Sequence, residues 1–197
     1  CFTEMNRCLV IALLLLVHLI PLKSQEVAVK SNLLYDAVTA INLGVETPLS
    51  PQWTVDVSGG LKAWDLKSDS RWRHYYIQPE VRYYLCDIFS GHFFGAHLLG
   101  GQYNVGGTKS GIPLSFTDFS QLSTTRTQGW YLGAGVAYGY SWILNEHWNI
   151  EAELGYGYAY TRYDRFPCAT CGDKLEENMP HHYVGPTKAA VSLIYLF

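Results

Sequence analysis

Long segments of alternating side chains constrain the fold of this chain more than any other sequence feature. From Trp148 to Thr161 the even positions are apolar or aromatic, and the odd positions are charged, polar or small. Residues 130–144 and the segment that ends at Phe197 repeat this alternation. A period of two is typical of a β-strand whose two faces meet different environments. The sequence therefore predicts an all-β fold.

Eight such segments can be traced, and most exceed the usual strand length of about 5–6 residues. They reach the roughly 9–11 residues that a tilted strand needs to cross a membrane. Short and long connections alternate, although 37–40 is short for its side, as in outer-membrane barrels with short periplasmic turns and long extracellular loops. The sequence predicts an eight-stranded antiparallel up-and-down transmembrane β-barrel with both ends in the periplasm. The expected strands are 28–36, 41–49, 53–64, 74–85, 92–104, 129–143, 148–162 and 183–197.

The second face of the alternation carries charges of both signs, which a membrane barrel would turn inward. Eight strands enclose a space that side chains just fill, and charges buried there must be paired or hydrated. In segment 92–104 we expect Phe94, Ala96 and Leu98 outside and His97 inside. The predicted interior is a filled ion-pair network, not a pore. Its expected members are Lys30, Asp36, Glu46, Asp56, Lys62, Glu80, Arg82, Glu151, Glu153 and Lys188.

Aromatic residues gather at the two ends of the outward faces. Membrane barrels carry an aromatic girdle at each interface, because the rings of Trp and Tyr combine an apolar body with a polar tip. A soluble sandwich would hide such residues in its core. The girdle predicted at the periplasmic ends consists of Trp53, Tyr83, Phe94, Trp142, Trp148, Tyr195 and Phe197, and the opposite girdle of Tyr35, Tyr75, Trp130, Tyr160 and Tyr183.

The start of the chain is predicted to be a signal peptide. Arg7 precedes an apolar run of 13 residues, 8–20, which Pro21 ends. A membrane-spanning helix needs about 20 residues, so the run fits a secretory signal better than an uncleaved anchor. We expect residues 1–25 to be the signal, with 1–4 a spurious start before Met5, and 26–197 to be the barrel.

Several motifs resemble one family. The segments 30–36, 42–46, 78–84, 91–95 and 101–107 are similar to those of small outer-membrane barrels from Bacteroides-like bacteria, a domain of unknown function. The resemblance implies an eight-stranded barrel similar to the membrane domain of outer-membrane protein A, and it implies no activity. The terminal phenylalanine also resembles the C-terminal signal that the barrel-assembly machinery reads.

Cysteines and histidines near the end of the chain allow three interpretations. Cys168 and Cys171 would form a disulfide in an oxidising compartment, which is the interpretation we favour. With His181 and His182 they would also supply the ligand types of a zinc site, although the spacing matches known sites weakly. A redox pair is the third possibility, but no thioredoxin-like βαβ unit surrounds it.

The expected function is non-enzymatic, at the cell outer membrane, either structural or adhesive through loops 105–128 and 163–182. A formal net charge of -3 does not indicate nucleic-acid binding. We expect a monomer without cofactor or metal. The expected partners are membrane lipid, lipopolysaccharide (which 69–74 could contact), the barrel-assembly machinery, and a surface ligand or fimbrial component.

Three other functions stay open at this point. Histidines predicted near the rim, His74, His181 and His182, could serve a lipid-modifying enzyme, although no nucleophile and base are fixed by the sequence. A soluble periplasmic ligand-binding barrel is a second alternative. A conducting channel is a third, which a filled interior disfavours.

Overall fold

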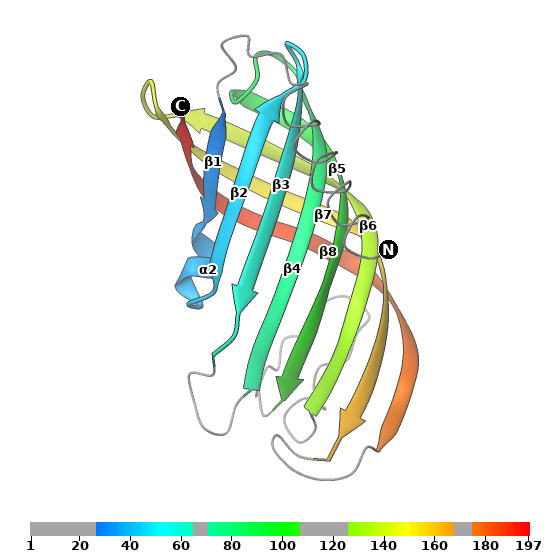
Figure 1. Cartoon of the computed structure of the whole chain (residues 1–197). Helices are drawn as coiled ribbons and strands as arrows, with labels where there is room; N and C mark the ends of the chain where they lie inside the picture. The colour runs from blue at the N-terminus through cyan, green and yellow to red at the C-terminus, as the bar shows by residue number, and fades with distance from the viewer. Residues whose placement is uncertain (1–26, 65–70, 107–125, 168–174) are drawn as a thin grey trace, which may run out of the picture.

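The computed structural model describes residues 27–64, 71–106, 126–167 and 175–197. Each strand pairs antiparallel with the next, and the last returns to pair with the first, which closes one sheet into a barrel (Figure 1). The eight predicted strands and their up-and-down order are therefore confirmed. Their bounds are β1 (Ala28–Asn32), β2 (Ile41–Pro48), β3 (Trp53–Lys62), β4 (Arg71–Tyr84), β5 (Gly91–Gly106), β6 (Arg126–Ile143), β7 (Trp148–Phe166) and β8 (Glu176–Leu196).

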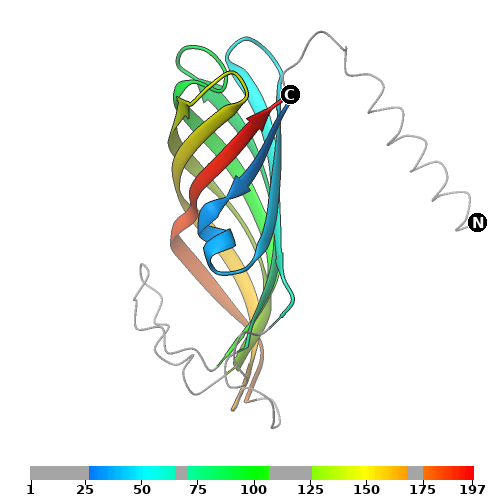
Figure 2. The ribbon, with the colours of Figure 1, turned by 90° about the vertical axis from the view of Figure 1, so that its left-hand side faces the viewer.

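The strands lengthen steadily around the barrel. The shortest, β1, has 5 residues and the longest, β8, has 21, and these two are neighbours. The short turns 49–52, 85–90 and 144–147 lie at the same end of the barrel as the C-terminus (Figure 2). At that end the Leu196 amide donates to the His147 carbonyl at 2.8 Å. No helix among the described residues is long and apolar enough to cross a membrane.

The first predicted strand ends early. Residues 33–36, expected to continue it, belong to a short helix, α2 (Leu33–Ala37). Asn32 begins the helix, because its side chain accepts a hydrogen bond from the Leu34 amide at 3.1 Å. The connection from β1 to β2 therefore covers 33–40 and is longer than predicted.

The segment 163–182, predicted to be a loop, is mostly strand. The pairing of β7 with β8 continues through Tyr163↔Met179 and Arg165↔Glu176. Both faces of these outer ends carry polar residues, so the hydrophobic alternation disappears while the hydrogen-bonded ladder persists. The other long predicted loop, 105–128, is also shorter in the structure, because β5 runs to Gly106 and β6 begins at Arg126. Residues 107–125, the signal segment, Cys168 and Cys171 lie outside the described residues.

A β-bulge in β8 changes which face its residues occupy. Lys188 pairs with Gly155, whereas Pro186, two residues earlier, pairs with the adjacent Tyr156. This extra residue reverses the side-chain parity of the strand. Tyr183, predicted in the outer girdle, consequently pairs with Ala159, whose side chain is buried inside the barrel.

Polarity is inverted relative to a water-soluble core. Among the described residues, large apolar side chains stand on the outer surface, with Leu154 72% and Val136 67% exposed. The fully buried side chains include an arginine and several carboxylates. In segment 92–104 His97 is buried and Phe94 and Leu98 are exposed, the orientation that the sequence predicts.

Candidate functional site

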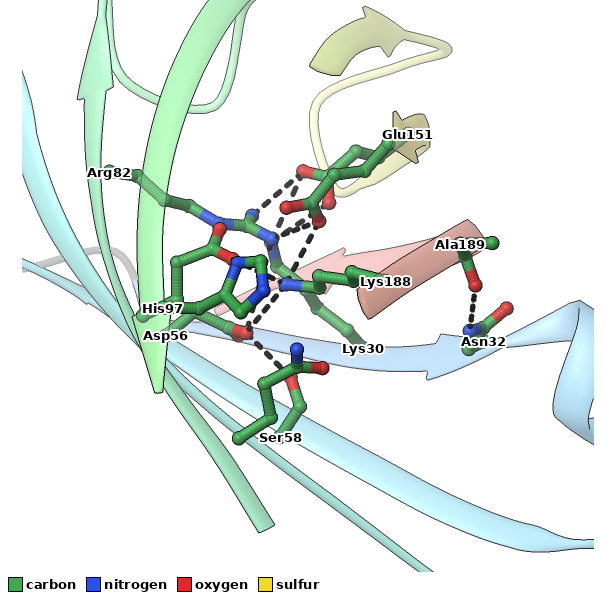
Figure 3. A network of polar contacts seen from close by, with 12 residues as sticks. Lys30, Asn32, Asp56, Ser58, Arg82, His97, Glu151, Lys188 and Ala189 are labelled. Atoms are coloured by element: carbon green, nitrogen blue, oxygen red, sulfur yellow. Dashed lines mark hydrogen bonds and ion pairs between the residues drawn. The ribbon is translucent and has the colours of Figure 1, made fainter. Parts of the chain in front are cut away.

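The most distinctive site of the barrel is an ion-paired network around Arg82 in its interior (Figure 3). Arg82 lies on β4, and its partners come from strands on every side of the barrel. We call this set the Arg82 network. Its members are Lys30, Glu46, Asp56, Glu80, Arg82, His97, Glu151, Glu153 and Lys188.

The guanidinium of Arg82 uses all three of its nitrogens. Nε donates to Glu80 at 2.6 Å, and Nη2 donates to Glu153 at 2.7 Å. Nη1 donates to Glu46 at 2.9 Å and to Glu151 at 3.0 Å. Four glutamates from β2, β4 and β7 thus converge on one planar cation, which is the geometry that suits arginine better than lysine.

Two lysines complete the pairing on either side of Arg82. The Lys30 ammonium pairs with Glu46 and lies 3.2 Å from a carboxylate oxygen of Glu151. The Lys188 ammonium lies 2.8 Å from Glu80 and 3.0 Å from Glu153. Because Lys30 is on β1 and Lys188 is on β8, these ion pairs link the first and last strands to the middle of the sheet.

The network holds more acids than bases. Five carboxylates face three side chains that are basic at neutral pH, and His97 lies 3.4 Å from Glu80. The opposite ring nitrogen of His97 contacts the Thr187 hydroxyl at 2.8 Å. Neutral donors help to stabilise the carboxylates, since the Tyr84 hydroxyl donates to Glu46 at 3.0 Å and Thr54 donates to the same group.

Inward glycines make room for these long side chains. A Cβ on Gly95 would come within 2.6 Å of a Glu80 carboxylate oxygen. A Cβ on Gly155 would lie 2.8 Å from both His97 and Lys188. Larger residues at either position would displace the network.

Two of the predicted interior residues lie apart from the network. Lys62 is buried at the other end of the barrel, where it donates to the Val38 carbonyl at 2.8 Å. Asp36 differs from the prediction, because it lies on α2 with an exposed side chain. It accepts hydrogen bonds from Ser31 and Asn42, both at 2.8 Å, and so fixes the helix to β2.

The turn between β4 and β5 closes the barrel at the end where the chain terminates. Phe89 is 2% exposed and packs with Ala28, Ile194 and Leu196. Its carbonyl accepts hydrogen bonds from Ser141 at 2.9 Å and from Asn149 at 2.7 Å. This apolar plug and the adjacent Arg82 network fill that half of the interior.

The predicted girdle residues fall into two groups. At the short-turn end, ring contacts on the outer surface join Trp53 to Tyr83 and Trp148 to Tyr195, each with centroids 5.0 Å apart. Phe94, Trp142 and Phe197 are exposed at the same end, and Tyr75, Trp130 and Tyr160 stand toward the opposite end of their strands.

Two aromatic residues differ from the girdle prediction. Tyr183 is turned by the bulge, and Tyr35 lies on α2, with its ring 5.1 Å from that of Tyr76. Tyr76 is on the inward face of β4, the face of Gln78 and Arg82. Tyr35 therefore covers the interior instead of facing outward.

The three histidines predicted near the rim do not form one cluster. His74 packs beside Tyr35 and Tyr76, His181 pairs with the inward Thr161, and the ring of His182 lies 5.3 Å from that of Tyr160. Within the described ranges no group of three or more metal-binding side chains is found. Cys86, which the sequence leaves without a local partner, is a free, exposed thiol.

A family model described as "Protein of unknown function (DUF3575)" matches residues 9–197. The chain belongs to that family. The resemblance stated from the motifs is thereby confirmed at the level of a family of unknown function. A search of curated proteins finds no match to the chain.

Sequence reasoning missed the neutral members of the interior. Thr54, Gln78 and Tyr84 share the parity of Asp56, Glu80 and Arg82 on β3 and β4, so the alternation could have identified them. Thr187 is the extra residue of the bulge, and parity alone could not have placed it.

Proposed function

We propose that this DUF3575 protein is a non-enzymatic outer-membrane barrel, anchored by its apolar outer wall and used as a scaffold for contacts at the cell surface. The observation that supports this most is the inverted polarity of the wall and the interior. In water, the exposed leucines and valines would cost free energy, and a soluble barrel would bury such residues in its interior in place of a charged network. In a bilayer the same distribution is favourable, because lipid covers the outer wall.

The strand lengths support a surface role. A strand needs roughly 9–11 residues to cross a membrane, whereas β6, β7 and β8 have 18, 19 and 21. Their ends away from the short turns carry polar residues such as Gln128, Asp164 and Asn178. In the proposed orientation this wall extends beyond the lipid and presents connections 107–125 and 167–175 to partners.

The proposed location also accounts for the two ends of the chain. A signal peptide at residues 1–25 would direct export, and Tyr195 on β8 would contribute to an aromatic strand that the assembly machinery can bind. With the short turns in the periplasm, the start of β1 and the end of β8 lie on that side. The filled half of the barrel then faces the periplasm, which disfavours conduction of ions.

One substitution tests the membrane location directly. Leu154→Arg places a charge on the most exposed large apolar residue of the outer wall. In a bilayer it should lower the free energy of unfolding by about 2–4 kcal/mol near mid-depth, and by roughly 0–1 kcal/mol near an interface. Gln102→Arg, an exposed position level with Trp130, is the matched control. Unfolding in lipid vesicles measures both.

Cell fractionation and gel migration complete the test. We expect the protein in the outer-membrane fraction, and we expect its migration to change on heating, as for a closed barrel that resists detergent. Recovery in the soluble fraction without detergent, together with equal stability of the two arginine variants, would refute the membrane location and favour a soluble ligand-binding barrel.

A further inference from the structure

The barrel wall is interrupted where β1 ends. Strand β8 pairs with β1 over only five positions, Ala28↔Leu196 to Asn32↔Ser192. From Glu176 to Val191, β8 has a strand partner on one side only within the described part of the chain, namely β7. Helix α2 lies in this interruption, beside β8 (Figure 2). We call it the wall gap, bounded by α2 and β2 on one side and by residues 186–191 of β8 on the other.

Side chains replace the missing strand along part of the gap. The side-chain amide of Asn32 donates to the Ala189 carbonyl at 3.2 Å (Figure 3). The side-chain oxygen of Asn32 accepts from the Val191 amide at 3.3 Å. Gln78 reaches across the interior and donates to the Thr187 carbonyl at 3.4 Å. Pro186 has no amide hydrogen to satisfy. Backbone groups along this edge of β8 are therefore satisfied without a neighbouring strand, so the wall gap can remain open.

A pocket of about 530 Å³ runs through the wall gap. Its lining includes Arg82 and Glu151, which are buried inside the barrel, and also Leu43 and Ala189, which are exposed on its outer surface. Leu34 of α2 and Pro186 of β8, which bound the gap on its two sides, line the same pocket, so the pocket extends from the interior to the gap. Its volume lies in the range of small-ligand sites, about 300–1,000 Å³.

The inner part of the pocket has an unused acceptor. Asp56 is fully buried and lines the pocket, and its Oδ1 atom has no hydrogen-bond partner among the residues that the structure describes. Its other oxygen accepts from Ser58 at 2.5 Å. Gly44 lies beside this oxygen, because a Cβ there would be 3.4 Å from it and 2.9 Å from the Ser58 hydroxyl. A buried carboxylate oxygen without a donor is costly, so this position favours a ligand that brings one.

The outer mouth of the pocket is apolar. Leu34 and Leu43 are 47% and 57% exposed, and neighbouring Val45 is 41% exposed. Deeper in the same pocket, Lys30 and Lys188 lie near Asp56, each already paired with glutamates of the Arg82 network. A molecule that matches this order has aliphatic chains at the mouth and a polar headgroup inside that ends in a hydrogen-bond donor.

We propose that the wall gap binds a membrane phospholipid whose headgroup carries a hydrogen-bond donor, an ammonium or a hydroxyl. The headgroup enters the pocket and donates to Asp56, while the acyl chains leave between α2 and β8 along the outer wall. This inference rests on the proposed membrane location, because the lipid reaches the gap sideways from the bilayer.

Binding of defined phospholipids to the full mature chain tests the headgroup. The purified barrel in detergent micelles is titrated with one lipid at a time, and bound lipid is counted by native mass spectrometry. Phosphatidylethanolamine or phosphatidylglycerol should bind about tenfold more tightly than phosphatidylcholine with the same acyl chains, the effect of one hydrogen bond to a charged group. Which of the two binds better distinguishes ammonium from hydroxyl.

A size control separates hydrogen bonding from steric fit. Dimethyl-phosphatidylethanolamine keeps one N–H donor and is nearly as bulky as phosphatidylcholine. It should bind more tightly than phosphatidylcholine. Equal binding of phosphatidylcholine and the donor-bearing lipids would overturn the proposal.

Two variants place the lipid at this pocket. Asp56→Asn keeps the side-chain size and should remove the preference for donor-bearing lipids. Gly44→Leu fills the pocket and should reduce binding at least about fivefold, whereas Gly100→Leu, an outer-wall position with open contacts, should not. Heat-modifiable migration shows that each variant is folded. Variants that fold and bind like the wild type would refute the site. A folded, membrane-inserted barrel that binds no lipid would refute only this inference, whereas a soluble barrel would refute the location as well.

Discussion

The two halves of this barrel along its axis are built differently. In the half that contains the short turns, all eight strands are paired around the circumference, and the interior is filled by the Arg82 network and the Phe89 plug. In the other half β1 is replaced by α2, and the wall between β2 and β8 is interrupted. The first half we call the closed half and the second the open half.

The difference shows two ways in which the polar groups of a barrel can be paired. In the closed half, backbone groups are paired by strands, so the interior needs only to neutralise its own charges. In the open half, side chains such as Asn32 and Gln78 also satisfy backbone groups of β8. The closed half therefore should set the stability of the barrel, and the open half should set what it binds.

Removal of Arg82 should have the largest effect on the closed half. Arg82→Met leaves four glutamates without their common cation, and uncompensated buried charge costs about 3–5 kcal/mol. We expect the free energy of unfolding to fall by at least that amount, or the barrel not to fold. Denaturant unfolding in detergent, followed by gel migration, measures the change.

A second arginine provides the matched control for that change. Arg162 on β7 is exposed, with hydrogen bonds to Tyr160 and Asn178 at the outer end of the barrel. Arg162→Met should leave stability nearly unchanged. If the two variants were equally stable, the Arg82 network would not hold the closed half together.

Loss of the Phe89 ring should have the next largest effect. Phe89→Ala removes a buried ring from the plug while keeping the carbonyl that Ser141 and Asn149 contact. Large-to-small changes of this kind cost about 3–5 kcal/mol. We expect the lower end of that range, because the plug lies at the mouth of the barrel and can relax. Phe94→Ala, on the outer surface, is the control, and urea unfolding in detergent should show a smaller loss for it.

Sequence alternation was sufficient for the closed half. Within their strands Glu80 and Arg82, and again Glu151 and Glu153, are two residues apart, and a β-strand turns such residues to one side. The two-residue period alone therefore predicts that these side chains point into the interior. It does not show that Arg82 is the centre, because that depends on register between strands far apart in the sequence.

The open half could not be predicted in the same way. Residues 33–36 were expected to continue β1, whereas in the structure they form a short helix that Asn32 caps. Tyr183 was misplaced because one extra residue at a bulge reverses parity, which the alternation does not show, although Gly185 and Pro186 beside the bulge are residue types that bulges favour. Residues 163–166 and 176–182 were predicted as loop because strands with two polar faces lose the hydrophobic period.

Substitution of Asn32, at the boundary between the halves, should have the smallest effect on stability. Asn32→Ala removes the helix cap and both hydrogen bonds to β8, which is worth about 1–2 kcal/mol. Amide hydrogen exchange locates the loss. The Val191 amide, held by the Asn32 side chain, should exchange about tenfold faster in the variant, whereas Leu193, which lies opposite Ser31 in the β1–β8 ladder, should change little. If both amides were accelerated equally, Asn32 would support the closed half as well, and the boundary would lie nearer the chain ends than the strand pairing indicates.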